Sequence, residues 1–308
     1  AVVVHQLIYL FIHYDREYEI IFKDVILRSI LIVVPAVIVF YSLFIIHIQL
    51  LPYVGDGDLF MTDEFRARLL LPSGAHQPEF AGIQPLGLTN ALSELISTMH
   101  EVNINLRATH PFQSYWYQWI LIQCKPVLYW QKLRAGYGMW IYCVGNAASW
   151  LFSAFFGIFG FIVISLLGAS VRFRLAFNPQ YLEQNPNSFS TCLHEALERH
   201  WWHALLFWVG YLGNYLPYAM IPRAVWNYHY IPALIFAFML CGVIAQILLE
   251  TLEKYDCIWY NILKSFFVVV MLSVTSCFLY LAPWTYALPM SDLLNSDRFL
   301  FDSWLFRG

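Results

Sequence analysis

Long apolar stretches alternate with shorter polar segments along the chain. A transmembrane helix needs about 20 mostly apolar residues, and five stretches reach that length: 26–48, 147–169, 201–220, 231–249 and 263–282. Pro35 lies inside the first of them, where neighbouring helices can bond the carbonyl that a proline leaves free. The pattern therefore predicts an all-α integral membrane protein, a polytopic helical bundle with about five complete spans.

Two segments precede the first span. Residues 1–12 are apolar but too short to cross a bilayer, and they are typical of the end of a membrane helix that begins upstream. Residues 13–24 are polar and predict a loop. We therefore expect residues 1–51 to hold the end of one helix, a cytosolic loop and the first full span, and we expect further sequence before Ala1.

The polar region between the first two spans, residues 52–143, is long enough to fold by itself. It opens with a Gly-Asp turn, continues with a short amphipathic helix from Asp63, and shows helical spacing again over 89–107. It is predicted to be a lumenal region of amphipathic and interfacial helices. The last region, 144–308, is predicted to hold four spans and an aromatic, polar tail.

Positive charge assigns the two faces of the membrane, because Lys and Arg are enriched in short cytosolic loops. Eight such residues lie near the membrane on one side: Arg16, Lys23, Arg28, Arg172, Arg174, Arg199, Lys254 and Lys264. That side is predicted to be cytosolic. Residues 52–143, the short turn 221–230 and the tail 283–308 are then lumenal.

Composition agrees with this pattern and excludes several classes. Hydrophobic residues make up 60% of the 308 positions and charged residues 12%, whereas soluble domains carry about 25% charged residues. No basic run favours nucleic-acid binding. The six cysteines are scattered without a CxxC pair, so neither a zinc site nor a disulfide framework is indicated.

The aromatic stretch 110–130 is the first candidate site. Seven of its 21 residues are aromatic, and rings with one polar edge concentrate where hydrocarbon meets lipid headgroups. His110, Gln113 and Lys125 stand among those rings and could bind a polar headgroup or a phosphate. The alternative, which this stretch alone favours, is a purely structural aromatic belt.

The turn 221–230 is the second candidate site. Arg223, Tyr228 and His229 lie in it, and Pro232 suits the first turn of the helix that follows. A short turn holds its side chains at the membrane surface, where cations that converge would suit the phosphate of a lipid-linked substrate. Equally, the arginine could extend to the interface and the tyrosines could anchor the helix ends.

Two other polar clusters are weaker candidates. An acidic patch follows the first span, and carboxylates can act as acid and base; two of them open a helix, however, where they complement its dipole. Three histidines begin the third span without the HExxH spacing of a zinc site, so no metal is predicted there. These residues are Asp56, Asp58, Asp63, Glu64, His194, His200 and His203.

Five blocks, in order, resemble one family: the protein O-mannosyltransferases that use dolichyl- or polyprenyl-phosphate mannose, within the GT-C membrane glycosyltransferases. The blocks are IHIQLLPYVGDGDLFMTDEFRARL, HPFQSYWYQWILIQCKPVLYW, GNAASWLF, PRAVWNYHYIPALIFAF and LAPWTYALPMSDLLNSDRFLFDSWL. Each block is degenerate alone, but their order and their positions relative to the spans are specific. The resemblance covers nearly all of the chain.

The resemblance implies the C-terminal membrane half of such an enzyme. The family's catalytic acidic pair lies in its first lumenal loop, in the other half, so no catalytic residue is assigned here. The lumenal MIR domain of eukaryotic members has no room between Leu71 and Thr89, so the chain resembles the MIR-lacking members. Lys125 stands before Pro126 where the family has Arg; Lys keeps the charge but loses the two-pronged geometry.

The activity that the resemblance implies is transfer of mannose from lipid phosphate to Ser or Thr hydroxyls, with inversion. A carboxylate activates the hydroxyl, and lumenal cations hold the leaving phosphate. No cofactor or metal is expected, because the lipid-linked mannose phosphate is itself the donor. The residues implied for donor and phosphate binding are Arg223, His229, Tyr228, Lys125, His110 and Gln113.

Two hypotheses follow for function. In the first, the chain is part of an O-mannosyltransferase and needs a complementing N-terminal half to act on its acceptor proteins. In the second, it is a non-catalytic, lipid-binding subunit of a larger membrane complex derived from this family. The endoplasmic reticulum membrane is expected, with the mitochondrial inner membrane or a bacterial plasma membrane as alternatives. A channel is disfavoured, because no span centre carries a run of ionisable residues.

Overall fold

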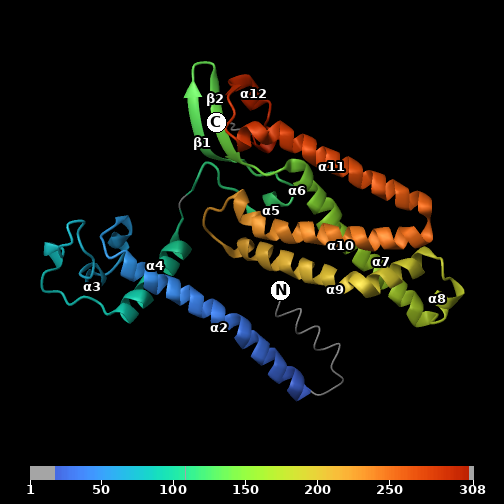
Figure 1. Cartoon of the computed structure of the whole chain (residues 1–308), viewed down its shortest axis with the longest axis horizontal. Helices are drawn as coiled ribbons and strands as arrows, with labels where there is room; N and C mark the ends of the chain where they lie inside the picture. Colours follow the sequence, from blue (N-terminus) through green and yellow to red (C-terminus); the bar gives the residue numbers. More distant parts are fainter. Residues whose placement is uncertain (1–17, 108, 305–308) are drawn as a thin grey trace. The chain divides into compact units, whose positions relative to one another are not determined.

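The computed structural model describes residues 18–107 and 109–304, and these are mostly helical (Figure 1). They divide into two compact units, one on each side of residue 108. The boundary between the units falls inside the predicted lumenal region, 52–143. The predicted helix end at 1–12 and the first part of the predicted loop, 13–17, lie outside the described residues.

The first unit begins with the 33-residue helix α2 (Tyr18–Leu50), which contains the first predicted span. The prediction of a loop as far as residue 24 is wrong, because residues 18–24 are already helical. Helical hydrogen bonds are made within the backbone and do not depend on apolar side chains, so a helix can continue into polar sequence. Apolar length therefore locates the span but not the end of its helix.

Beyond α2 the unit consists of shorter elements, of which α4 corresponds to the helix predicted at 89–107 but ends two residues earlier, at Asn105. Thr62 caps α3, because its Oγ1 accepts a hydrogen bond from the N–H of Phe65 at 3.3 Å. Glu94 of α4 accepts from both the N–H and the hydroxyl of Thr62, at 2.7 and 2.9 Å. Asp63 and Glu64 occupy the first turn of α3, which fits the helix-dipole interpretation. The elements are η1 (Asp56–Phe60), α3 (Asp63–Arg66), η2 (Pro78–Phe80) and α4 (Leu88–Asn105).

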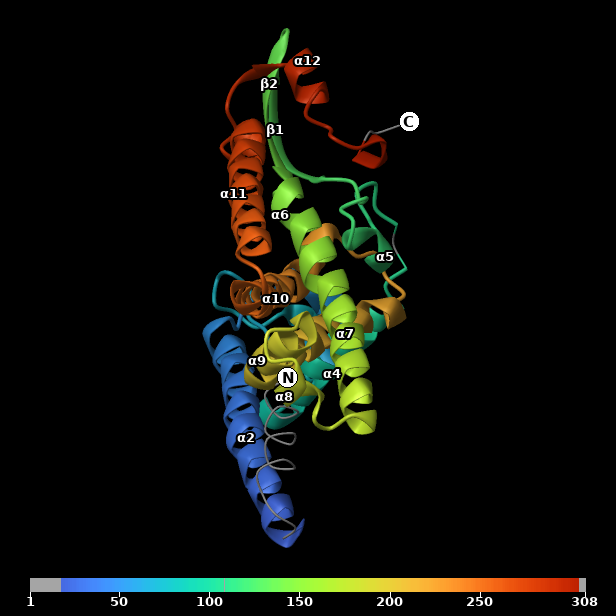
Figure 2. The same ribbon diagram turned by 90° about the vertical axis from the view of Figure 1, so that its right-hand side faces the viewer.

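The second unit contains a β-hairpin that was not predicted from the sequence, although the mostly helical membrane architecture is confirmed. The strands β1 (Val127–Arg134) and β2 (Tyr137–Cys143) pair antiparallel, and β3 (Met290–Ser291) adds to β2, so the sheet order is β1-β2-β3. Both views show the hairpin continuing from α6 in the direction away from α7 (Figure 2).

The rest of the second unit is helical. A π-helical stretch, η3, joins α6 and α7 into one rod, and Asp256 caps α11 directly after α10 ends. The elements are α5 (Trp116–Trp119), α6 (Ala147–Phe152), η3 (Ser153–Phe159), α7 (Gly160–Phe177), α8 (Tyr181–Gln184), α9 (Phe189–Tyr215), η4 (Leu216–Met220), η5 (Asn227–Tyr230), α10 (Ile231–Tyr255), α11 (Cys257–Thr285), α12 (Asp292–Ser296) and η6 (Asp302–Trp304).

Four stretches of the described helices are long and apolar enough to cross a membrane. They are Ile26–Leu50, Ala147–Phe177, Asn227–Tyr255 and Cys257–Thr285, and each contains one of the predicted spans. The remaining predicted span, 201–220, begins in α9. This 27-residue helix has more polar residues and is not among the four. That span stays a prediction.

The helices α9 and α10 run side by side and hold the turn 216–230 at one end (Figure 1). Small residues bring them close: a Cβ at Gly210 would lie 2.5 Å from the ring of Phe236. Ala196, Ala204 and Leu240 are buried in the same contact. The close packing makes the two helices a firm support for the turn between them.

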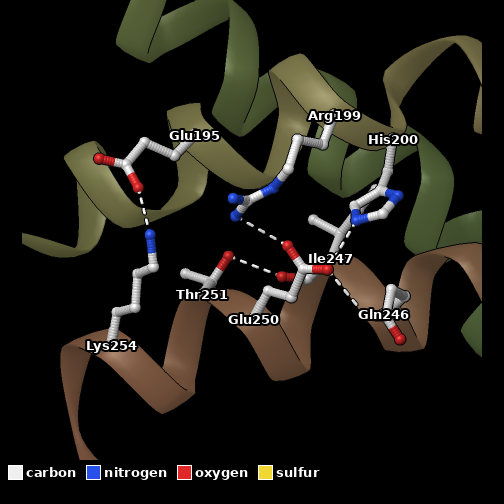
Figure 3. Close-up of polar contacts among 8 residues, drawn as sticks. All are labelled: Glu195, Arg199, His200, Gln246, Ile247, Glu250, Thr251 and Lys254. Atoms are coloured by element: carbon white, nitrogen blue, oxygen red, sulfur yellow. Dashed lines mark hydrogen bonds and ion pairs between the residues drawn. The ribbon is translucent and has the colours of Figure 1, made fainter.

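Polar side chains join α9 and α10 at the end opposite the turn (Figure 3). Glu250 is the centre: its carboxylate lies 2.8 Å from Arg199 and 2.7 Å from His200, and it accepts from Gln246 at 2.7 Å. Lys254 pairs with Glu195 one turn further along. His200 therefore bonds a carboxylate of the neighbouring helix.

We expect that Glu250→Gln will lower the stability of the second unit by about 1–2 kcal/mol, because hydrogen bonds to charged partners contribute about that much when half-buried. Thermal unfolding in lipid nanodiscs measures this as a lower midpoint. The matched control is Glu198→Gln, whose carboxylate pairs with Arg172 at 3.2 Å with both side chains more than half exposed. Such a pair contributes less than about 1 kcal/mol, so equal losses in the two variants would contradict the prediction.

The thiol of Cys124 gives a second prediction. It is buried in the core of the second unit, and burial raises its pKa to about 12. The thiol stays protonated at pH 8, and only the thiolate reacts readily with alkylating reagents. In the folded protein Cys124 is expected to resist maleimide at pH 8 while exposed Cys257 reacts. Mass spectrometry of tryptic peptides measures both; rapid labelling of Cys124 without denaturant would contradict the prediction.

Candidate functional site

The aromatic stretch 110–130 contributes its central tryptophan to the core. Trp119, at the end of α5, is fully buried. Its indole N–H donates to the Ser114 hydroxyl at 2.8 Å, and its carbonyl accepts from the indole of Trp150 in α6 at 2.6 Å. The hydrogen bond from Trp150 therefore holds the centre of the stretch against α6. The belt interpretation fits only its outer rings: Tyr115 and Tyr117 are exposed and stack on one another.

The same stretch lies against the turn 221–230, and the predicted topology puts both on one side of the membrane. The N–H of Ser114 donates to the carbonyl of Val225 at 2.8 Å and forms an isolated antiparallel bridge. The indole of Trp226 donates to Nδ1 of His110 at 3.4 Å, and the two rings meet edge to face. The two predicted candidate sites are thus parts of one site.

Stacked rings form one wall of this site. Trp226, Tyr228 and His229 lie nearly parallel, with centroids 4.6–5.8 Å apart. Nδ1 of His229 lies 3.1 Å from both the N and the O of Trp226, so the backbone of that residue fixes the imidazole. The other ring nitrogen, Nε2, takes no part in this arrangement. Tyr228 is 41% exposed and forms the outer surface of the stack.

Arg223 lies beside this stack, close enough for its charge to act on His229. Its side chain is half-buried, and its Nε is shielded from water without a hydrogen-bond partner among the described residues. A buried donor without an acceptor costs about 1–3 kcal/mol. An anion beside the guanidinium would remove that cost.

Two of the other predicted residues are placed less directly. Gln113 exchanges hydrogen bonds with His110: its N–H donates to the His110 carbonyl at 2.9 Å, and its Oε1 accepts from the His110 N–H at 3.1 Å. It therefore shapes the turn that presents His110. Lys125 is half-buried between Cys124 and Pro126, and its part in ligand binding stays a prediction.

Several residues of the site were not predicted. Trp226 was missed, although it lies three residues before His229 in the same turn. The rings of Trp119 and Tyr218 also flank His229, at 6.5 and 5.5 Å. Beneath the stack, the hydroxyl of buried Tyr230 bonds that of Tyr211 at 3.1 Å. No local sequence pattern indicated these contacts, because they join four separate elements, α5, α9, η4 and η5.

Comparisons with known proteins agree with this architecture. Residues 89–304 match a family model described as the C-terminal four TMM region of protein-O-mannosyltransferase. Protein O-mannosyltransferase 1 of Drosophila pseudoobscura pseudoobscura is 28% identical over 162 residues, which are 51% of this chain and 15% of that protein. Dolichyl-phosphate-mannose--protein mannosyltransferase 5 of Candida albicans is 27% identical over 221 residues, 69% of this chain and 28% of that protein.

A solved structure shares the fold. It is the Saccharomyces cerevisiae protein O-mannosyltransferase Pmt1-Pmt2 complex bound to the sugar donor, with a TM-score of 0.55 and 18% identity over 73% of this chain and 28% of that chain. This chain thus spans less than a third of the relatives that it matches. Because the family model covers well over half of the sequence, the chain belongs to the protein O-mannosyltransferase family, as a C-terminal membrane region of it.

Proposed function

We propose that this chain forms the phosphate-binding half of a protein O-mannosyltransferase site and holds the phosphate of a dolichyl- or polyprenyl-phosphate mannose donor beside Arg223. Transfer of mannose to Ser or Thr is proposed for the assembled enzyme, because the resemblance places the catalytic acidic pair in the N-terminal half. The chain is therefore not proposed to be catalytic by itself. The endoplasmic reticulum membrane is the proposed location.

The observation that carries this proposal is the buried Nε of Arg223 without a partner among the described residues. A guanidinium presents parallel N–H donors that match two oxygens of a phosphate. A phosphate oxygen at Nε would supply the missing acceptor. Nε2 of His229 is the second donor proposed for the same group.

The charge of the surrounding segments supports an anion rather than a cation. Residues 109–130 and 216–230, which build the site, contain Lys125 and Arg223 but no Asp or Glu. A bound phosphate would therefore meet no carboxylate from either segment. The positive charge near it would be strengthened by the low polarity of the stacked rings.

The depth of the site suits a phosphate that is attached to a lipid. The turn leads directly into α10, and the membrane-spanning stretch there begins at Asn227. Aromatic rings such as Tyr228 are favoured at the level of lipid headgroups. A phosphate held at this level can keep its prenyl chain in the hydrocarbon layer, whereas a soluble sugar phosphate would gain nothing from that position.

The alternative function is a non-catalytic, lipid-binding subunit of a larger membrane complex. Both functions use the phosphate site, so phosphate binding alone does not separate them. The solved structure that shares the fold is described as a complex of two family members bound to the sugar donor. That description favours an assembled enzyme over a subunit of an unrelated complex.

We predict that Arg223→Ala weakens binding of a short-chain prenyl phosphate to the purified chain in nanodiscs by roughly tenfold or more, because a charge-assisted hydrogen bond contributes about 1.5–3 kcal/mol. Arg223→Lys is expected to recover part of the affinity. Phosphorus NMR titration measures both. The control is Arg174→Ala, at the far end of α7, where the guanidinium bonds Tyr181 instead.

The matching prenyl alcohol tests the chemistry of the ligand, because it lacks the phosphate and its binding should not change in the Arg223 variants. Wild-type affinity for the phosphate in Arg223→Ala would overturn the proposal. Mannose transfer, measured after co-expression with an N-terminal half from a family member, separates the two functions. Transfer that depends on Arg223 supports the enzyme. Isolation of this chain in a stable membrane complex that has no mannosyltransferase activity supports the subunit.

A further inference from the structure

The hairpin of β1 and β2 exposes almost the whole of its outer strand. β1 lies at the edge of the sheet, and six of its eight residues are exposed. Tyr129 is 80% exposed and Leu133 60%. An edge strand directs half of its backbone N–H and C=O groups away from the sheet, where they can pair with another extended chain. Proteins usually cover, shorten, bulge or charge an edge of this length. The register of β1 shifts between Leu128 and Trp130, so its regular edge runs from Trp130 to Arg134.

The two faces of the hairpin differ. On one face β2 buries Trp140 and Tyr142, and the Tyr142 ring contacts Trp284 of α11 and Phe299 at 4.7 and 5.6 Å. The other face carries alternate residues of β1, which stand opposite half-buried or exposed residues of β2. These residues of β1 are Trp130, Lys132 and Arg134, opposite Ile141, Met139 and Tyr137.

The charge of this second face is not neutralised. Residues 127–143 contain Lys132 and Arg134 but no Asp or Glu. Neither cation forms an ion pair within the described part of the chain, whereas Arg66, Arg172 and Arg199 do. Arg134 donates to the Tyr137 hydroxyl at 3.0 Å. That hydroxyl carries no charge, so the bond does not neutralise the guanidinium. The exposed strand thus combines an open backbone edge with two uncompensated cations.

The position of the hairpin argues against the lipid surface as its partner. The membrane-spanning stretch begins at Ala147, just after β2 ends. A strand of this length extends roughly 20 Å, and the hairpin runs on from α6 away from α7 (Figure 2). Its tip also pairs with β3, which follows the end of α11. Lys132 and Arg134 lie toward that tip, beyond the level of the helix ends.

A second copy of this chain is also a poor partner. Full-length antiparallel pairing of two β1 strands would set Lys132 of each opposite Tyr129 of the other, and Arg134 opposite Val127. No carboxylate of the second strand would then face either cation. An acidic strand would instead place carboxylates beside both cations.

We propose that β1 is a docking edge for an extended acidic segment of another polypeptide, which adds to the sheet by backbone pairing and sets its carboxylates against Lys132 and Arg134. This mode gives affinity through main-chain hydrogen bonds and selectivity through alternate side chains. Trp130 and Tyr129 supply apolar contact area beside the cations. The inference does not depend on the phosphate site.

Labelled nine-residue peptides test this proposal by fluorescence anisotropy, with the full chain in nanodiscs of uncharged phosphatidylcholine. A peptide of alternating Glu and Val is expected to bind, more weakly at higher salt. A peptide of alternating Lys and Val should bind at least tenfold more weakly. A Glu-Val peptide with two central valines replaced by Pro should lose binding, because Pro cannot donate to a strand ladder.

Charge reversal on the strand provides the matched variant. Lys132→Glu with Arg134→Glu should invert the preference, so that the Lys-Val peptide binds better. Arg174→Glu with Lys264→Glu changes the net charge equally, far from the hairpin in sequence, and should leave the Glu-Val affinity unchanged. Lys132→Gln with Arg134→Gln provides a milder loss if the reversed protein folds poorly, as judged by its thermal midpoint.

Three results would overturn the proposal. One is no binding of the Glu-Val peptide to the wild-type chain, and another is equal binding of the Pro-containing peptide, which would mean charge attraction without strand pairing. The third is an unchanged peptide preference in both hairpin variants. Dimerisation lost in these variants would assign the edge to a second copy, and binding to anionic vesicles lost in them would assign it to the lipid surface.

Discussion

The packing of α9 against α10 is the constraint on which the rest of the site depends. Glu250 bonds Arg199 and His200 at one end, and glycine and alanine keep the helices close along their length. The turn 216–230 joins the other end, so both of its attachment points are fixed. A turn held in this way can keep Arg223 beside His229 without further support, because side chains on rigid elements keep their geometry best.

Four tryptophans of the second unit donate their indole N–H groups to acceptors within it. Trp119, Trp150 and Trp304 donate to Ser114, to the Trp119 carbonyl and to the Ile122 carbonyl, and Trp284 donates to Asn295. Buried polar groups in native proteins are nearly always bonded in this way. Among the described residues of the same unit, the Nε of Arg223 and the Oδ1 of Asn227 are buried without a hydrogen-bond partner. The proposed anion would give the Nε of Arg223 an acceptor.

The sequence predicted what the bilayer imposes and missed what depends on tertiary contacts. Apolar length located four spans. Alternation of the five predicted spans put His110 and Arg223 on one side, and the bond between Trp226 and His110 agrees with that placement. That bond joins residues 116 apart, so no local pattern contained it. The hairpin was missed because residues 137–143 are apolar or aromatic on both faces, which hides the alternation of a strand. The helical start of α2 was missed because polarity ends a span but not a helix.

The hairpin and the turn 221–230 are physically joined. Asn227, between Trp226 and Tyr228, donates through Nδ2 to the carbonyl of Cys143, the last residue of β2, at 2.7 Å. A polypeptide docked on β1 would therefore be separated from the turn 221–230 by the strand β2 alone. The two positive sites differ in burial: Arg223 is half-buried and its charge is screened less by salt, whereas Lys132 and Arg134 are exposed and their charges are screened more. That difference is consistent with both proposals, a lipid phosphate held closely at Arg223 and a protein partner bound more weakly and reversibly at β1.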